Sequence, residues 1–176
     1  RFYRRHRRPS GRNYPAKDWA GDFAPRMTAR IPPQRLPGQR FRMEITERAV
    51  SYYSEGEHIA GVVYAPSAGP ARKPGIVLCH GFTAIKEVIL PDYARAFAEA
   101  GFVALAFDYR GFGESGGPPG RLIARRQIED IRNSVTFLRS LAEVDPERVG
   151  LWGTSYGAGN VIVAGAEDPR VRCVTA

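Results

Sequence analysis

A serine stands between two glycines in residues 153–157, which have the sequence GTSYG. A short apolar run, residues 149–152, precedes this pattern, and a run of small residues, 158–166, follows it. This order predicts a strand, a sharp turn and a helix, with Ser155 at the turn. The glycines fit such a turn, because side chains two positions before and after the serine would collide with the strand and the helix. Since the short pattern also occurs by chance, the prediction depends on the strand and helix around it.

Apolar runs alternate with helical patterns along residues 41–176. Strands are expected at residues 41–53, 59–64, 75–79, 102–107, 149–152 and 171–175. Helices are expected at residues 91–100, over the apolar positions spaced three and four apart in residues 128–141, and directly after Ser155. Strands that alternate with helices predict an α/β fold with a mostly parallel, doubly wound sheet. Residues 75–79 and 149–152 should be central strands, because their apolar runs are uninterrupted.

The basic charge of the chain is concentrated at its start. Residues 1–40 contain ten arginines and one lysine against two aspartates, a net charge of +9, whereas the whole chain carries +8. They also contain six prolines, so a basic, disordered leader is expected before an α/β domain at residues 41–176. A basic tail can bind nucleic acid or anionic membrane. This one shows no motif for such binding, and neither partner is expected.

Apolar runs and cysteines in the sequence bear on the compartment of the protein. No apolar run reaches the roughly 18 residues that a membrane helix needs, and no apolar segment of a secretory signal follows the basic start. Cys79 and Cys173 both lie in apolar, strand-like runs, so both are expected to be small buried residues. A reduced, cytoplasmic setting is therefore expected.

Three predicted strand ends bring chemically useful residues to the same edge of the sheet. Ser155 is the candidate nucleophile, and the amide of Tyr156 is a candidate donor to an oxyanion. Gly81, just after the strand at residues 75–79, would let the backbone pass close to the nucleophile. His80 could serve as a general base, but holding its loop by hydrogen bonds is the favoured role. The alternative for Ser155 is a serine that only caps a helix.

Residues 108–116 (DYRGFGESG) formally match a dinucleotide-binding fingerprint. Glycines of that fingerprint must open a helix, whereas residues 117–120 (GPPG) prolong a loop in this chain. No cofactor and no bound metal are expected. Asp108 ends a predicted strand, and it is expected to bind Arg110 or backbone amides rather than to orient a catalytic base.

Three stretches together, residues 75–82, 107–115 and 149–157, resemble the α/β-hydrolase superfamily. These stretches are similar to the branch of dienelactone-hydrolase-like and Xaa-Pro-dipeptidyl-peptidase-like esterases, and to thioesterases of polyketide pathways. The resemblance implies that Ser155 is the nucleophile and that the amides of Phe82 and Tyr156 form the oxyanion hole.

The function implied by this resemblance is that of a serine hydrolase. It would cleave an ester or thioester of a small molecule through an acyl-enzyme on Ser155. A peptidase of the same fold, or a hydrolase-like protein that binds without catalysis, remains an alternative. Oligomeric state is left open.

The family's other two catalytic groups have no counterpart in the sequence. The histidines, His6, His58 and His80, all precede Ser155, whereas the acid and the histidine of this family follow the serine. Both are expected beyond residue 176, in a longer enzyme whose sheet continues past the strand at residues 171–175. The 176-residue chain alone is therefore expected to be inactive.

Overall fold

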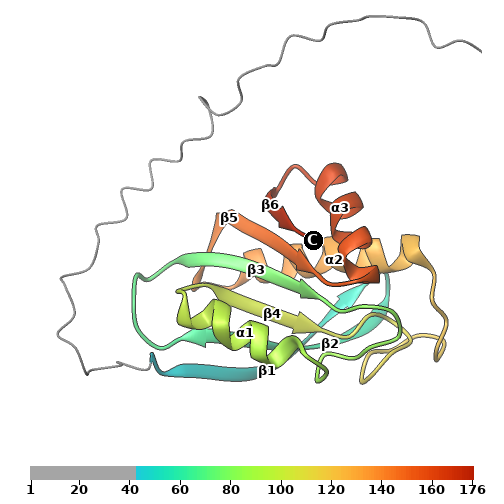
Figure 1. The fold of residues 1–176 in the computed structure, drawn as a ribbon, viewed down its shortest axis with the longest axis horizontal. Coiled ribbons are helices and arrows are strands. Elements are labelled where there is room, and N and C mark those ends of the chain that lie inside the picture. The colour runs from blue at the N-terminus through green and yellow to red at the C-terminus, as the bar shows by residue number, and fades with distance from the viewer. Residues whose placement is uncertain (1–42) are drawn as a thin grey trace, which may run out of the picture. The chain divides into compact units, whose positions relative to one another are not determined.

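The computed structural model describes residues 43–176, in which six strands form one sheet (Figure 1). The strands are β1 (Ile45–Ser54), β2 (Glu57–Pro66), β3 (Lys73–Cys79), β4 (Val103–Phe107), β5 (Val144–Gly153) and β6 (Val171–Thr175). Their order across the sheet is β1-β2-β4-β3-β5-β6. The β1–β2 and β2–β4 pairs are antiparallel, and the other three pairs are parallel. The predicted α/β fold is therefore confirmed.

The predicted leader, residues 1–40, lies outside the described residues. The leader and the domain boundary at residue 41 remain predictions.

A two-residue turn joins β1 to β2. Glu55 and Gly56 both have positive φ, at 49° and 86°, between the paired residues Ser54 and Glu57. Turns with two positive φ values match the right-handed twist of a hairpin. This turn brings the start of β2 to the edge of the sheet where β4 ends, because Gly61 pairs with Phe107.

β3 and β5 are interior strands, as their apolar sequences predict. β3 has β4 on one side and β5 on the other, and β5 lies between β3 and β6. β5 is longer than expected, because it begins at Val144 and so contains Pro146. The ladder with β3 is irregular there, with a register shift between Lys73 and Gly75. A proline is tolerated in a strand at such an irregular end.

Three helices cover the two faces of the sheet (Figure 1). α1 (Leu90–Glu99) packs Leu90, Ala94 and Ala98 against one face. α2 (Ala124–Ser140) and α3 (Tyr156–Glu167) pack against the other face, which holds the larger apolar core. The layers put the carboxyl ends of the parallel strands, and the loops that follow them, at one edge.

The two cysteines differ in burial. Cys79 is buried in β3 as expected, but Cys173 is exposed. The expectation for Cys173 was wrong because β6 is the outermost strand among residues 43–176, with a neighbour on one side only.

Each helix in this part of the chain is too short or too polar to cross a membrane. The compartment remains a prediction.

Candidate active site

Ser155 lies at the turn between β5 and α3, where the sequence places it. It directly precedes Tyr156, the first residue of α3, and its backbone has φ 54° and ψ −120°. Positive φ is uncommon for any residue with a side chain, because it costs free energy. Residues in such strained conformations cluster at functional sites. The side chain of Ser155 is exposed. The turn therefore presents the hydroxyl at the edge of the sheet.

The glycine two positions after the serine is required by a close approach of two backbones. A Cβ atom at Gly157 would collide with the carbonyl oxygens of Cys79 and His80 at the end of β3. The first turn of α3 can therefore lie directly against β3 only because residue 157 has no side chain.

The loop after β3 lies against the serine. A Cβ atom at Gly81 would be 3.2 Å from Cβ and 3.6 Å from Oγ of Ser155. The amide of Thr154 donates a hydrogen bond of 3.2 Å to the carbonyl oxygen of Cys79. The rings of Phe82 and Tyr156 contact edge to face, with centroids 6.0 Å apart. The structure thus brings together the three residues that the sequence predicts for the site: Ser155, Phe82 and Tyr156.

Two backbone amides near the serine have N–H groups available. Within residues 43–176 the amide of Phe82 makes no hydrogen bond to another backbone group. Tyr156 is the first residue of α3, and the first amides of a helix have no acceptor within the helix. Such N–H groups are the kind that stabilise an oxyanion. Their assignment to an oxyanion hole remains a prediction.

His80 is buried beside the serine, but it is bonded elsewhere. Its Nδ1 lies 3.0 Å from the carbonyl oxygen of Gly81, and its Nε2 has no hydrogen-bond partner among the described residues. Burial lowers the pKa of His80, and the hydrogen bond with Gly81 only partly opposes that effect. Neither ring nitrogen is bonded to Ser155, which favours the loop-holding role over the role of general base.

Asp108 binds backbone amides, one of the two kinds of partner expected for it, and a lysine that was not expected. Its carboxylate accepts hydrogen bonds from the amides of Lys86 at 2.7 Å and Glu114 at 3.0 Å, so the expected contact with backbone amides is present. Its cationic partner is Lys86, whose Nζ lies 2.8 Å away. Arg110 instead binds Asp130 at 2.7 Å. Of the two kinds of partner expected for Asp108, the structure thus shows the backbone amides, because the backbone turns after β4 and carries Arg110 towards α2.

Lys86 is a residue of this edge that the sequence did not single out. Lys86 lies between a predicted strand and a predicted helix, where lysines are usually exposed, and the sequence around it does not indicate that its side chain is buried. Yet only 4% of its side chain is exposed, and its Nζ lies within 2.8 Å of Asp108, Glu87 and Glu114. Burial alone would lower the pKa of Lys86, but the hydrogen bonds to these carboxylates outweigh burial and raise it.

The same three carboxylates have oxygen atoms close enough together to suggest a metal site. The ammonium group of Lys86 already lies among them and supplies the positive charge. This cluster is therefore better described as an ion-pair network than as a metal centre.

The glycine-rich loop after β4 has a structural use. A Cβ atom at Gly113 would collide with the carboxylate of Asp108, and Gly113 has φ 53°. The loop can therefore fold over Asp108 only with glycine at this position. α2 begins at Ala124, well after Gly116, so these glycines do not open a helix as a dinucleotide-binding loop would.

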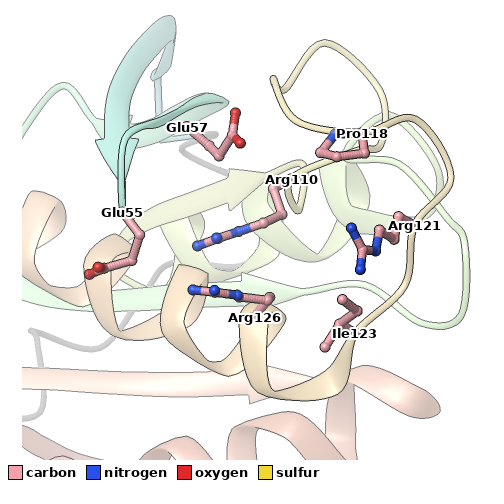
Figure 2. A pocket seen from close by; sticks show the side chains of 7 residues that line it. All are labelled: Glu55, Glu57, Arg110, Pro118, Arg121, Ile123 and Arg126. Carbon is pink, nitrogen blue, oxygen red and sulfur yellow. The ribbon is translucent and has the colours of Figure 1, made fainter.

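A hollow of about 240 Å³ lies at the edge where β4 ends (Figure 2). Its lining residues are Glu55, Glu57, Arg110, Pro118, Arg121, Ile123 and Arg126. Ser155 is not one of them. Asp130 binds Arg110 and Glu129 binds Arg126, while two glutamates line the hollow, so its charges largely offset one another. The hollow is separate from the candidate catalytic site.

The chain matches known proteins over most of the described residues. A family model described as the alpha/beta hydrolase fold matches residues 74–176, more than half of the chain. A 31.7 kDa protein of the traX-finO intergenic region of Escherichia coli is 46% identical over 132 residues, which cover 75% of this chain and 44% of that protein. The thiohydrolase aneE of Aspergillus aculeatus is 40% identical over 121 residues, 68% of this chain and 37% of that one.

A solved structure agrees with these sequence matches. The α/β hydrolase GrgF from Penicillium is similar with a TM-score of 0.69 and 31% identity, over 73% of this chain and 44% of that chain. The chain thus spans less than half the length of these relatives. The family match covers more than half of the chain, so the chain belongs to the α/β-hydrolase fold family.

Proposed function

We propose that the protein to which this chain belongs hydrolyses an ester or thioester of a small molecule through an acyl-enzyme on Ser155. The observation that carries the proposal is the backbone of Ser155, which has φ 54° at a strand–helix turn while Gly81 lies against its side chain. A structural serine needs no such conformation. A nucleophile does, because the strained turn projects its hydroxyl away from the sheet.

In this proposal the amides of Phe82 and Tyr156 bind the oxyanion of the tetrahedral intermediate. The two segments that carry these amides contact each other. The ring of Phe82 contacts the ring of Tyr156, and Gly81 lies against Ser155. Donors fixed in this way favour the transition state, since they need no rearrangement when charge develops. The name of one relative, the thiohydrolase aneE, supports a thioester among the candidate substrates.

A serine hydroxyl also needs a base that takes its proton. His80 is bonded to Gly81, and His58 lies in the strand β2 of the antiparallel part of the sheet. Because the acid and the histidine of this fold follow the nucleophile in the chain, we propose that the base and its acidic partner are supplied by residues beyond 176. The chain of 176 residues would then be inactive by itself, while the complete protein would be active.

Labelling by a fluorophosphonate probe tests the function directly. The complete protein should react at Ser155, as mass spectrometry of the labelled peptide would show. Ser155→Ala should abolish labelling and lower turnover of short acyl esters by about 10⁶-fold. Ser140→Ala, which removes an exposed serine at the end of α2, should change neither.

The alternatives predict other results. A peptidase of the same fold would label at Ser155 but prefer peptide amides over acyl esters. A hydrolase-like binding protein would remain unlabelled even at full length. Rapid labelling of the 176-residue chain that disappears in His80→Ala would show that the base is His80 and not a residue beyond 176.

A further inference from the structure

The hydrogen bond of His80 fixes the state of its ring. Nδ1 lies 3.0 Å from the carbonyl oxygen of Gly81. A carbonyl oxygen can only accept, so Nδ1 must carry the hydrogen atom. Burial keeps the ring neutral by lowering the pKa of His80. His80 therefore holds the Gly81 carbonyl as a single-proton donor.

The carbonyl that His80 holds is bonded to the nitrogen of Phe82. The carbonyl of Gly81 and the N–H of Phe82 belong to one peptide group, which is planar and trans. In a trans peptide the C=O and the N–H point in opposite directions. A donor that fixes the direction of the Gly81 carbonyl therefore fixes the direction of the Phe82 N–H.

The loop that contains this peptide does not hold its own shape well. Thr83 has φ 51°, a strained conformation for a β-branched residue. Within the loop, the amide of Ala84 reaches the Gly81 carbonyl only at 3.4 Å. The contact from His80 is shorter, at 3.0 Å. An anchor from outside the turn is therefore needed to keep the Gly81–Phe82 peptide in one orientation.

The ring of His80 is itself held rigidly. Only 1% of the residue is exposed. The ring of Tyr109, which is fully buried, packs against it edge to face with centroids 4.6 Å apart. Since a buried ring in contact with another buried ring cannot turn freely, Nδ1 stays aimed at Gly81.

We propose that His80 is a positioning residue of the candidate oxyanion hole. Its Nδ1–H holds the carbonyl of Gly81, and this contact aims the N–H of Phe82 at the oxyanion that forms next to Ser155. This role rests on the proposed function, and His80 would act by position alone, without exchanging a proton or forming a bond with the substrate.

Three substitutions at residue 80 separate this role from simple packing. The side-chain amide of His80→Asn can place an N–H where Nδ1 lies, so it can still hold Gly81. The amide of His80→Gln reaches instead to the position of Nε2, and His80→Leu has no donor. Asn and Gln are both uncharged amides, so this pair gives the comparison even if the leucine variant folds poorly. Tyr109→Phe is the control for disturbed packing, since the hydroxyl of Tyr109 has no hydrogen-bond partner among the described residues.

Steady-state kinetics of the complete protein on a short acyl ester measure the effect. Loss of an oxyanion donor costs about 10²–10³-fold in kcat, and a misdirected donor should cost part of that. We expect His80→Gln and His80→Leu to lose about 10–100-fold in kcat with KM changed less than about threefold. His80→Asn and Tyr109→Phe should stay within about fivefold of the parent enzyme. A trifluoromethyl ketone, which forms an oxyanion on the serine, should lose affinity in the same order.

Equal activity of the Asn, Gln and Leu variants would overturn the inference, as would a loss that appears in KM and not in kcat. Failure of the proposed function looks different: the parent protein would then show neither hydrolysis nor fluorophosphonate labelling at Ser155. Labelling of the parent protein followed by indistinguishable Asn and Gln variants would refute the role of His80 alone.

Discussion

The ammonium group of Lys86 lies 2.8 Å from a carboxylate oxygen of Asp108, and the two residues belong to different loops at the same edge of the sheet. Lys86 follows β3, whereas Asp108 directly follows β4. The loop that contains Gly81 and Phe82 is thereby tied to the loop that contains Gly113. This ion pair is buried, with 4% of the Lys86 side chain and none of the Asp108 side chain exposed.

Replacing Lys86 with methionine should destabilise the fold. The carboxylate of Asp108 would remain buried with only the amides of Lys86 and Glu114 as donors. Breaking a buried ion pair from one side costs about 3–5 kcal/mol, and the two remaining amides favour the lower end, about 3 kcal/mol. Urea unfolding followed by circular dichroism would measure the change.

Glu114→Gln is the matched control for this network. Its carboxylate also binds Lys86, but 74% of its side chain is exposed. Exposed ion pairs contribute about 0–1 kcal/mol, so this variant should unfold close to the parent midpoint. Equal losses of unfolding free energy in Lys86→Met and Glu114→Gln would contradict the view that the buried pair with Asp108 is the main contribution of Lys86 to stability.

Two glycines of α3 should respond oppositely to alanine. At Gly157 a Cβ atom would collide with the carbonyl oxygens of Cys79 and His80, so Gly157→Ala should cost at least about 2 kcal/mol. At Gly159 a Cβ atom would meet nothing within 4 Å. Gly159→Ala should stabilise the protein by about 0.5–1 kcal/mol, because alanine favours a helix interior over glycine. Thermal unfolding of both variants tests the close contact of α3 with β3.

The strain at Ser155 should be measurable without any substrate. Alanine at position 155 keeps the positive φ of 54° and its cost, whereas glycine adopts such values readily. Ser155→Gly should therefore be more stable than Ser155→Ala by about 1 kcal/mol. Finding the alanine variant equally stable would indicate that the turn relaxes in solution.

His80 should make stability depend on pH in mildly acidic solution. Burial lowers its pKa in the folded state, partly offset by the hydrogen bond with Gly81 and by the charges of Asp108 and Glu87. The unfolded chain therefore binds a proton first as pH falls below about 6.5. Stability should fall with pH below that value by up to about 1.4 kcal/mol per unit, until the folded state is protonated as well.

Unfolding free energies measured between pH 5 and 8 would show this effect. His80→Asn should remove the slope below about pH 6.5. His58→Asn removes an exposed histidine and leaves His80 in place, so the slope should persist. A slope that survives in His80→Asn would assign the pH dependence to other groups.

Much of the fold could be predicted from local sequence. The strand–turn–helix around Ser155 and the interior strands β3 and β5 follow from apolar runs and turn residues within about ten positions. Helix and strand ends were less certain: α2 starts at Ala124, before the first strongly apolar position, and β5 extends back through Pro146. In both cases the helix or strand begins earlier than the apolar pattern indicates, because contacts with other elements stabilise the additional residues.

Local sequence is enough to place residues at the carboxyl ends of the strands, because alternation of apolar runs and turns is a local property. It named Ser155, Phe82 and Tyr156 as site candidates, and their catalytic roles remain to be tested. The charged partners became known only from the fold, which pairs Lys86 with Asp108 and Arg110 with Asp130. It also decided that Nδ1 of His80 binds Gly81. Pairing depends on how each loop turns in space, and many partners are compatible with the same order of charges along the chain.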